Sequence, residues 1–166
     1  MPAPAMPGLM QDWSLTCTRI LDHAARNHPN REIVSRSIEG PIHRTNYAGM
    51  RRRALTVAKR LSRYGLSEGD RVATLAWNTW RHMEVWYGVS GCGAILHTLN
   101  PRLFAEQLDY IINHAEDKVI MVDADLVKLM EARTAEGYVF RTDLRLRPDA
   151  SVTPVCLSME TAERYY

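Results

Sequence analysis

The side chains of this sequence that could carry catalytic or metal chemistry are three cysteines and six histidines. The cysteines stand far apart and form no paired motif. No two histidines are four residues apart, and none has a cysteine partner at the spacing of a zinc site. The spacing therefore predicts no metal ligands, and no residue is assigned a catalytic role.

Cys92 and His97 are the nearest approach to a nucleophile with its base. They flank the start of an apolar run, and no third group is placed to orient the histidine. Gly91 and Gly93 resemble the start of a dinucleotide fingerprint, but Leu96 stands where the third glycine belongs. These features favour a structural thiol and close packing between a helix and a strand.

His97, Thr98 and Asn100 are the best candidates for a side chain that faces a binding cleft. They lie near the end of an apolar strand candidate, and open α/β sheets bind their ligands beyond the carboxyl ends of the strands. In the alternative interpretation, Asn100 and Pro101 only form the turn into the next helix.

The only charge cluster is basic and lies on one helix candidate. Its members are Arg51, Arg52, Arg53, Lys59, Arg60 and Arg63. Such a helix face attracts phosphates, so a nucleic-acid binder is one alternative. No aromatic residues alternate with the cations, which favours a solvated outer face and predicts no nucleic-acid partner.

The elements that would position these residues follow from the hydrophobic period between Asp70 and Asp123. Short apolar runs at 71–77, 94–99 and 118–122 predict buried strands, and the segments between them have helical spacing. Alternating strands and helices with short connections pair in parallel through right-handed crossovers. The sequence predicts a doubly wound α/β unit, with a mostly parallel sheet and helices on both faces.

The flanking sequence predicts further elements. Ser14 to Asn27 reads as a helix that Ser14 or Thr16 could cap, with an apolar face of Ile20, Leu21, Ala24 and Ala25. Residues 32–38 and 42–46 are expected to form a hairpin around a turn-like tripeptide. A second helix is expected from about Asn46 to Tyr64, and a short one over 124–130.

The composition is that of an ordinary globular protein. The chain has 166 residues, a formal net charge of +2, and 46% hydrophobic residues. Its length suggests one domain. No run approaches the roughly 18 apolar residues of a membrane span, and the N-terminus has no signal-peptide pattern. Unpaired cysteines fit a reducing compartment, so we expect a cytoplasmic protein.

The run GCGAILHTLNPRLFAEQLDYIINHAEDKVIMVDADL, residues 91–126, resembles the N-terminal part of AMP-forming acyl-CoA synthetases. The medium- and long-chain fatty-acid–CoA ligases are the most similar group. Residues 43–79 resemble the family's entry into a helix followed by its Gly-x-x-x-Gly-Asp-Arg-Val strand. Residues 12–36 resemble its opening helix and first strand. Gly49 departs from the family, which has an acidic residue there.

The resemblance implies fatty acid, ATP and CoA as substrates, with magnesium, and an acyl-adenylate that is passed to CoA. The family's phosphate loop is rich in Ser, Thr and Gly and ends in lysine, and this chain contains no such loop. It also lacks the later regions that carry the family's metal-binding Glu and catalytic Lys. We therefore expect a segment that is inactive alone and binds none of these cofactors by itself.

The sequence divides into a flexible lead-in (1–11), an α/β subdomain (12–132) and a tail (133–166) that leaves the family pattern near Arg133. A truncated or frame-shifted reading frame would explain the tail; a genuine short paralogue is the alternative. The rival function is a non-catalytic interaction or dimerisation module. Exposed apolar surface predicts either self-association or pairing with the missing remainder of the ligase.

Overall fold

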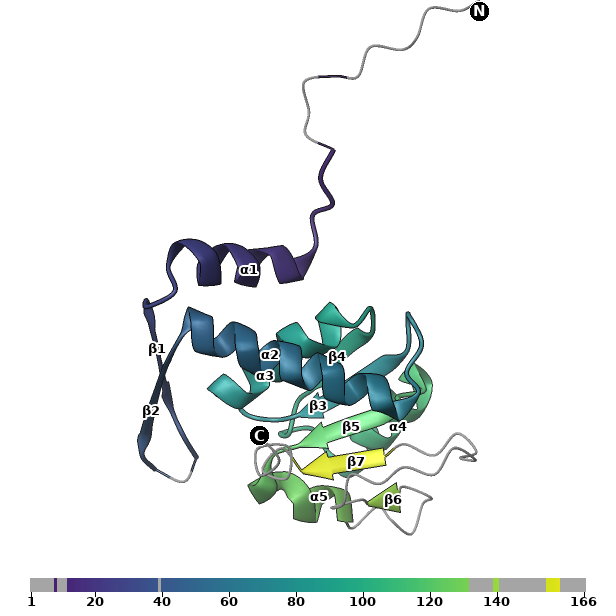
Figure 1. Ribbon diagram of the computed structural model, residues 1–166. Coiled ribbons are helices and arrows are strands. Elements are labelled where there is room, and N and C mark those ends of the chain that lie inside the picture. Colours follow the sequence, from purple (N-terminus) through teal and green to yellow (C-terminus); the bar gives the residue numbers. More distant parts are fainter. Residues whose placement is uncertain (1–7, 9–11, 39, 132–138, 141–154, 159–166) are drawn as a thin grey trace, which may run out of the picture.

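The computed structural model of the protein describes residues 8, 12–38, 40–131, 139–140 and 155–158 (Figure 1). In these ranges the main body is a parallel sheet with helices on both faces, and a separate two-stranded ribbon lies at one end. The predicted doubly wound α/β architecture is confirmed. None of the helices in the described ranges is long and apolar enough to cross a bilayer.

The parallel sheet has the strand order β4-β3-β5-β7-β6. Its strands are β3 (Arg71–Leu75), β4 (Ile95–Leu99), β5 (Val119–Val122), β6 (Val139–Phe140) and β7 (Val155–Ser158). β3 is central to the unit that was predicted, because β4 pairs with one of its edges and β5 with the other. The remaining two strands continue the sheet beyond β5, also in parallel.

The helices follow the predicted order along the chain. They are α1 (Cys17–Asn27), α2 (Tyr47–Leu61), α3 (Trp80–Gly91), α4 (Ala105–Ala115) and α5 (Val127–Glu131), with 3-10 turns at Ser62–Tyr64 and Ala124–Leu126. Asn46 begins α2, because its side-chain oxygen accepts a hydrogen bond from the Gly49 amide at 2.8 Å. Gly65 follows the turn after α2 with a φ of 62°, in the left-handed region that favours glycine.

Alternate residues of β3 point to two separate apolar cores. Val72 packs with residues of α2 and α3, including Val57 and Val89. On the opposite face of the sheet, Leu75 packs with Leu108 and Ile112 of α4. The burial of β3 on both faces explains its continuous apolar sequence.

Helices α2 and α3 approach each other very closely at Gly88. A β-carbon at this position would lie 2.6 Å from Val57 Cγ1 and 2.9 Å from the Ala54 carbonyl oxygen. Only a residue without a side chain fits this contact, so Gly88 sets the distance between the two helices.

The ribbon consists of β1 (Glu32–Arg36) and β2 (Ile42–Asn46), paired antiparallel as the sequence predicted. It is attached to the first residue of α3. Ser35 Oγ accepts a hydrogen bond from the Trp80 amide at 3.2 Å. The His43 ring stacks on the Trp80 ring with centroids 3.9 Å apart. The ribbon is therefore held at the end of the sheet where the strands finish.

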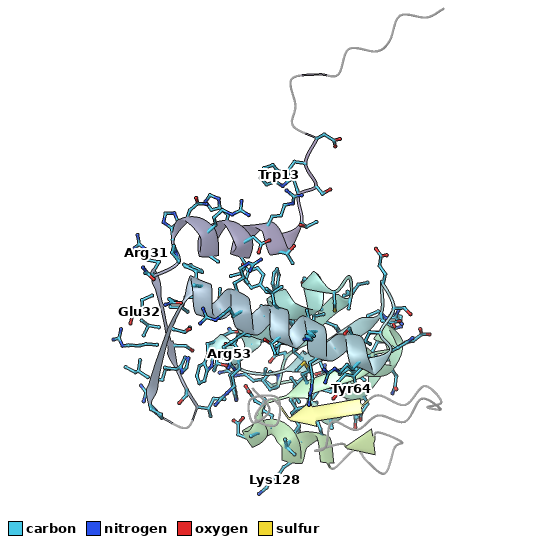
Figure 2. The ribbon with its side chains drawn as sticks, in the orientation of Figure 1. Trp13, Arg31, Glu32, Arg53, Tyr64 and Lys128 are labelled. Atoms are coloured by element: carbon cyan, nitrogen blue, oxygen red, sulfur yellow. The ribbon has the colours of Figure 1, made fainter. Side chains whose placement is uncertain are left out.

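The prediction for the first helix was partly wrong. It begins at Cys17 instead of Ser14, and Thr16 occupies the N-cap position without a capping side-chain bond. Ile20 is 64% exposed and Leu21 is buried, because α1 contacts α2 and α3 along a narrow stripe. Figure 2 shows the segment before α1, with Trp13, extending away from the body.

The predicted helix over 124–130 is a 3-10 turn followed by the short α5. The segment 138–146 alternates apolar and polar residues, as in a strand, and Val139–Phe140 is the part of it that the structure describes, as β6. The rest of that segment, and nearly all of the expected lead-in over 1–11, lie outside the described residues.

Candidate functional site at the strand ends

His97 lies in the middle of the edge strand β4, and its ring is hydrogen-bonded to a buried carboxyl group. Its Nδ1 is 2.8 Å from Oδ2 of Asp117, which is 1% exposed. Burial raises the pKa of Asp117, and the hydrogen bond from His97 partly opposes this shift. Oδ1 of the same carboxyl group is buried without a hydrogen-bond partner. This contact ties the edge strand to the loop that precedes β5.

The structure does not bring His97, Thr98 and Asn100 together as one cluster. Successive residues of a strand point to opposite faces, so Thr98 is exposed on the face opposite His97. Asn100 follows the strand, and its Oδ1 accepts a hydrogen bond from the Arg102 amide at 3.0 Å. This bond is the turn contact of the alternative interpretation, and a ligand-binding role for the three residues stays a prediction.

A different group of polar side chains gathers at the carboxyl ends of β3 and β5. Asp123 is buried, and its Oδ2 accepts a hydrogen bond from the Trp77 amide at 2.8 Å. Asp125 Oδ2 accepts a second one from the Trp77 indole at 2.9 Å. The two carboxylates hold the loop between β3 and α3 against the end of β5.

Beside this loop, His82 of α3 lies 3.0 Å from the hydroxyl of Thr74, through its Nε2. Burial lowers the pKa of His82, although a hydrogen bond to the backbone of Trp77 acts in the opposite direction. The histidine therefore favours the neutral form. The Thr79 hydroxyl at the start of α3 is buried without a hydrogen-bond partner.

The carboxylates at the strand ends accept hydrogen bonds and position the loop between β3 and α3. In the described ranges no three His, Cys, Asp or Glu side chains are placed to hold a metal ion. Cys92 donates its thiol hydrogen to the Val89 carbonyl, with Sγ and O 3.2 Å apart. This contact agrees with a structural thiol and not with a nucleophile activated by His97.

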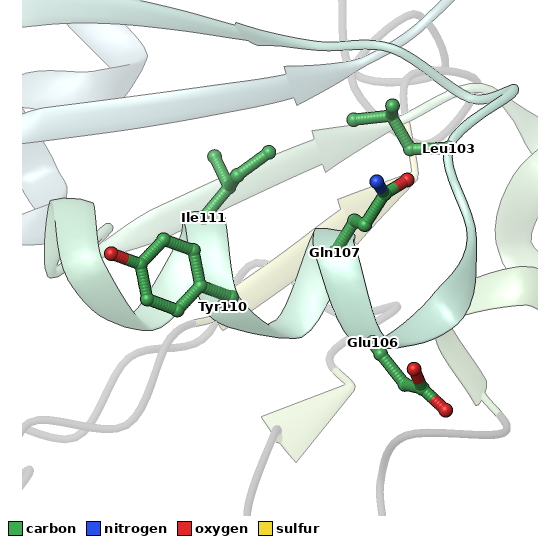
Figure 3. Close-up of a pocket in the computed structure, with 5 residues that line it drawn as sticks. All are labelled: Leu103, Glu106, Gln107, Tyr110 and Ile111. Atoms are coloured by element: carbon green, nitrogen blue, oxygen red, sulfur yellow. The ribbon is translucent and has the colours of Figure 1, made fainter.

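A shallow groove of about 350 Å³ runs along one side of α4 (Figure 3). Its lining residues are Leu103, Glu106, Gln107, Tyr110 and Ile111. Tyr110 is 67% exposed, and the Gln107 side-chain oxygen already accepts a hydrogen bond from the Phe104 amide at 3.2 Å. All five residues belong to α4 and the turn before it, so the groove is a helix surface and not a cleft between strand ends.

Sequence reasoning missed the contacts of Asp123, Asp125 and His82. The sequence did contain one signal: Asp123 directly follows the apolar run of β5, at the edge where open sheets bind their ligands. It did not reveal that the partner of Asp123 is a backbone amide 46 residues away.

The fold defines the class of protein, a doubly wound α/β unit of the kind that begins adenylate-forming ligases. A sequence model described as "AMP-binding enzyme" matches residues 21–160. The chain belongs to this AMP-binding enzyme family.

Similar proteins of this family are acyl-CoA ligases. A 3-methylmercaptopropionyl-CoA ligase of Ruegeria pomeroyi is 49% identical over 126 residues, which are 76% of this chain and 23% of that protein. A long-chain-fatty-acid–CoA ligase of Thermus thermophilus is 45% identical over 132 residues, 80% of this chain and 24% of that protein. The chain thus spans about a quarter of the length of these curated relatives.

A solved Mycobacterium tuberculosis fatty acyl CoA synthetase has the same fold. It superposes with a TM-score of 0.70 and 26% identity, and the match covers 89% of this chain and 27% of that one.

A shorter stretch of this chain is similar to a different enzyme. A bifunctional glutamine synthetase adenylyltransferase/adenylyl-removing enzyme of Agrobacterium fabrum is 61% identical over 41 residues. The matched stretch is 25% of this chain and 4% of that protein.

Proposed function

We propose that this chain supplies the N-terminal α/β unit of an acyl-CoA ligase that activates a fatty acid or a similar carboxylic acid with ATP and CoA. The observation that carries the proposal is the family match over residues 21–160 on a chain with the matching fold. The relatives, a 3-methylmercaptopropionyl-CoA ligase and a long-chain-fatty-acid–CoA ligase, indicate the substrate class.

The residues of this chain do not fit magnesium and ATP by themselves. No Ser/Thr/Gly-rich loop ending in lysine occurs in the 166 residues, and the described part holds no cluster of metal ligands. The chain's own contribution is the rigid sheet, with the loop after β3 held in place by Asp123 and Asp125.

We infer that the chain is inactive alone. Adenylation requires preorganised donors and cations around the phosphates, and loss of one such donor typically costs about 10²–10³ in rate. Here several would be missing together. ATP, magnesium and CoA would therefore be bound by the complete ligase and not by this chain.

The division of the chain is also a proposal. We propose that residues 12–132 are the ligase-like subdomain and that the tail after Arg133 has a separate origin. In support, 41 residues of this chain, a quarter of its length, are 61% identical to the glutamine synthetase adenylyltransferase; the match to the AMP-binding family model, by contrast, extends to residue 160. Mass spectrometry of the protein from its native cell tests this proposal. A peptide that spans residues 125–140 is expected, because one chain carries both the subdomain and the tail. Two separate products, one ending and one beginning between residues 125 and 140, would refute this division of a single chain.

We place the protein in the cytoplasm, where its cysteines would stay reduced. Cys17 is exposed and Cys92 half-buried, and neither forms a disulfide among the described residues.

A second candidate function is a self-associating interaction module. One edge of β4 has no strand partner among the described residues, and Ile95, Phe104 and Tyr110 are 52%, 78% and 67% exposed. Unpaired edges and exposed apolar side chains promote association. Light scattering after size exclusion should find dimers or larger species. A monomer that binds no hydrophobic dye would exclude this candidate.

The leading proposal is tested by grafting. Residues 12–130 of this chain would replace the matching segment of the Thermus long-chain ligase. If the segment is a ligase unit, the graft should fold and form acyl-CoA. A graft that melts cooperatively, as the parent ligase does, and still has no activity would contradict the proposal. A graft of residues 133–166 at the following position is the matched control and should abolish activity.

A further inference from the structure

Helix α2 and the turn after it carry positively charged side chains and no negatively charged ones. From Tyr47 to Tyr64 the sequence has six Arg and Lys residues and no Asp or Glu. The cations are not equivalent, because the neighbouring helices neutralise some of them and leave others in solvent.

The cations on the flanks of α2 have acidic partners. Arg51 forms an ion pair with Asp22 of α1, with 2.5 Å between Nε and Oδ1. Arg53 forms one with Glu84 of α3, again at 2.5 Å, and the Glu84 side chain is only 4% exposed. These two ion pairs connect the three helices, so the charges of Arg51 and Arg53 are neutralised within the fold.

The outward side of α2 is different. Arg52, Leu55, Lys59 and Arg63 are exposed there, and we call these four residues the α2 ridge. Its three cations form no ion pair within the part of the chain that the structure describes. In Figure 1, α2 lies at the front and no described helix or strand covers it. At 1.5 Å per residue the ridge is about 16 Å long.

We propose that the α2 ridge is a docking surface for a membrane that contains anionic phospholipids. A convex row of three unpaired cations complements a plane of lipid phosphates, and each basic residue near such a surface strengthens binding about fivefold. Leu55 stands between Arg52 and Lys59 with 52% of its surface exposed. An apolar side chain there can enter the headgroup region, as the apolar residues of interfacial helices do.

The same ridge lacks what a binder of single-stranded nucleic acid needs. Such proteins stack bases on aromatic side chains beside their cations. Neither Phe nor Trp occurs between Tyr47 and Tyr64, and these two tyrosines at the ends are themselves half-buried.

The test is sedimentation of the purified chain with vesicles of phosphatidylserine and phosphatidylcholine, compared with vesicles of phosphatidylcholine alone. Binding is expected only to the anionic vesicles, and it should weaken as salt is raised. Replacing Arg52, Lys59 and Arg63 together by Gln should reduce the vesicle affinity about 100-fold, at about fivefold for each cation. Leu55→Gln should reduce it severalfold.

The matched control replaces Arg36, Arg102 and Lys128 by Gln, which removes the same charge from exposed positions off the ridge. Lys128 lies on α5, on the far side of the sheet from α2 (Figure 2). This control should retain most of the vesicle affinity. Equal losses in both triple variants would show an effect of net charge alone and would overturn the proposal. Absence of vesicle binding would also overturn the proposal. So would binding to a short DNA or RNA duplex that depends on the ridge and is tighter than binding to the anionic vesicles.

Discussion

The contact between α2 and α3 gives the sharpest test of the packing. Gly88→Ala would place a β-carbon 2.6 Å from Val57 Cγ1 and 2.9 Å from the Ala54 carbonyl oxygen. The carbonyl belongs to the backbone of α2, so the two helices must move apart. Such overpacking costs about 1–3 kcal/mol, whereas the higher helix propensity of alanine returns up to about 1 kcal/mol.

We expect the free energy of unfolding to fall by about 1–2 kcal/mol. For a chain of this size this lowers Tm by about 2–8 °C. The assay is thermal and urea unfolding followed by circular dichroism. Gly91→Ala in the same helix is the control, because its β-carbon would meet only the Thr18 methyl group at 3.3 Å. This variant should be as stable as the original protein.

A double variant isolates the cause. Val57→Ala removes the nearest side-chain atoms, so Gly88→Ala should cost less in a Val57→Ala background than in the original sequence. If Gly88→Ala unfolds at the same temperature and urea concentration as Gly91→Ala, the close approach of the helices is wrong.

Two further predictions concern charge. Arg53→Ala removes an ion pair of the nearly buried Glu84 carboxylate, so it should lower the free energy of unfolding by about 2 kcal/mol. Arg52→Ala on the exposed ridge should change the free energy of unfolding by less than about 0.5 kcal/mol. Equal urea midpoints for the two variants would argue against the ion pair. The Ser67 amide, at 2.7 Å, and the Lys118 ammonium, at 3.0 Å, hold the pKa of Asp70 below its ordinary value of 3.8. The charged carboxylate therefore stabilises the fold above pH 3.8. This contribution to the free energy of unfolding is lost as the pH falls through the lower pKa of the folded state. The stability difference between the original protein and Asp70→Asn, measured by urea unfolding, should therefore shrink below pH 3.8, and a difference that stays constant into that range would contradict the assignment.

The fold was predictable because its signals are local. The apolar run of β3 is buried on both faces, so its sequence alone indicates a central strand. Asn46 is a favourable N-cap and does begin α2. The alternation of such strands and helices then leaves few possible topologies.

The polar contacts near the strand ends were not predictable, because they join residues that are distant in sequence. His97 meets Asp117 across β3, and Trp77 meets Asp123 across the β3–β5 pair. The period of a strand shows which residues share a face, but it does not show what covers that face. Thr98 and His97 were therefore grouped by sequence, although the strand separates them.

The most direct test of the central claim measures fatty-acid-dependent exchange of pyrophosphate into ATP by the purified chain. We expect no exchange above background at any acyl length, because the donors and cations that adenylation needs are absent from this sequence. The grafted Thermus ligase, assayed in parallel, should show robust exchange. Exchange by the isolated chain that disappears in a His97→Ala or Asn100→Ala variant would contradict the claim, since it would place adenylation chemistry on these 166 residues.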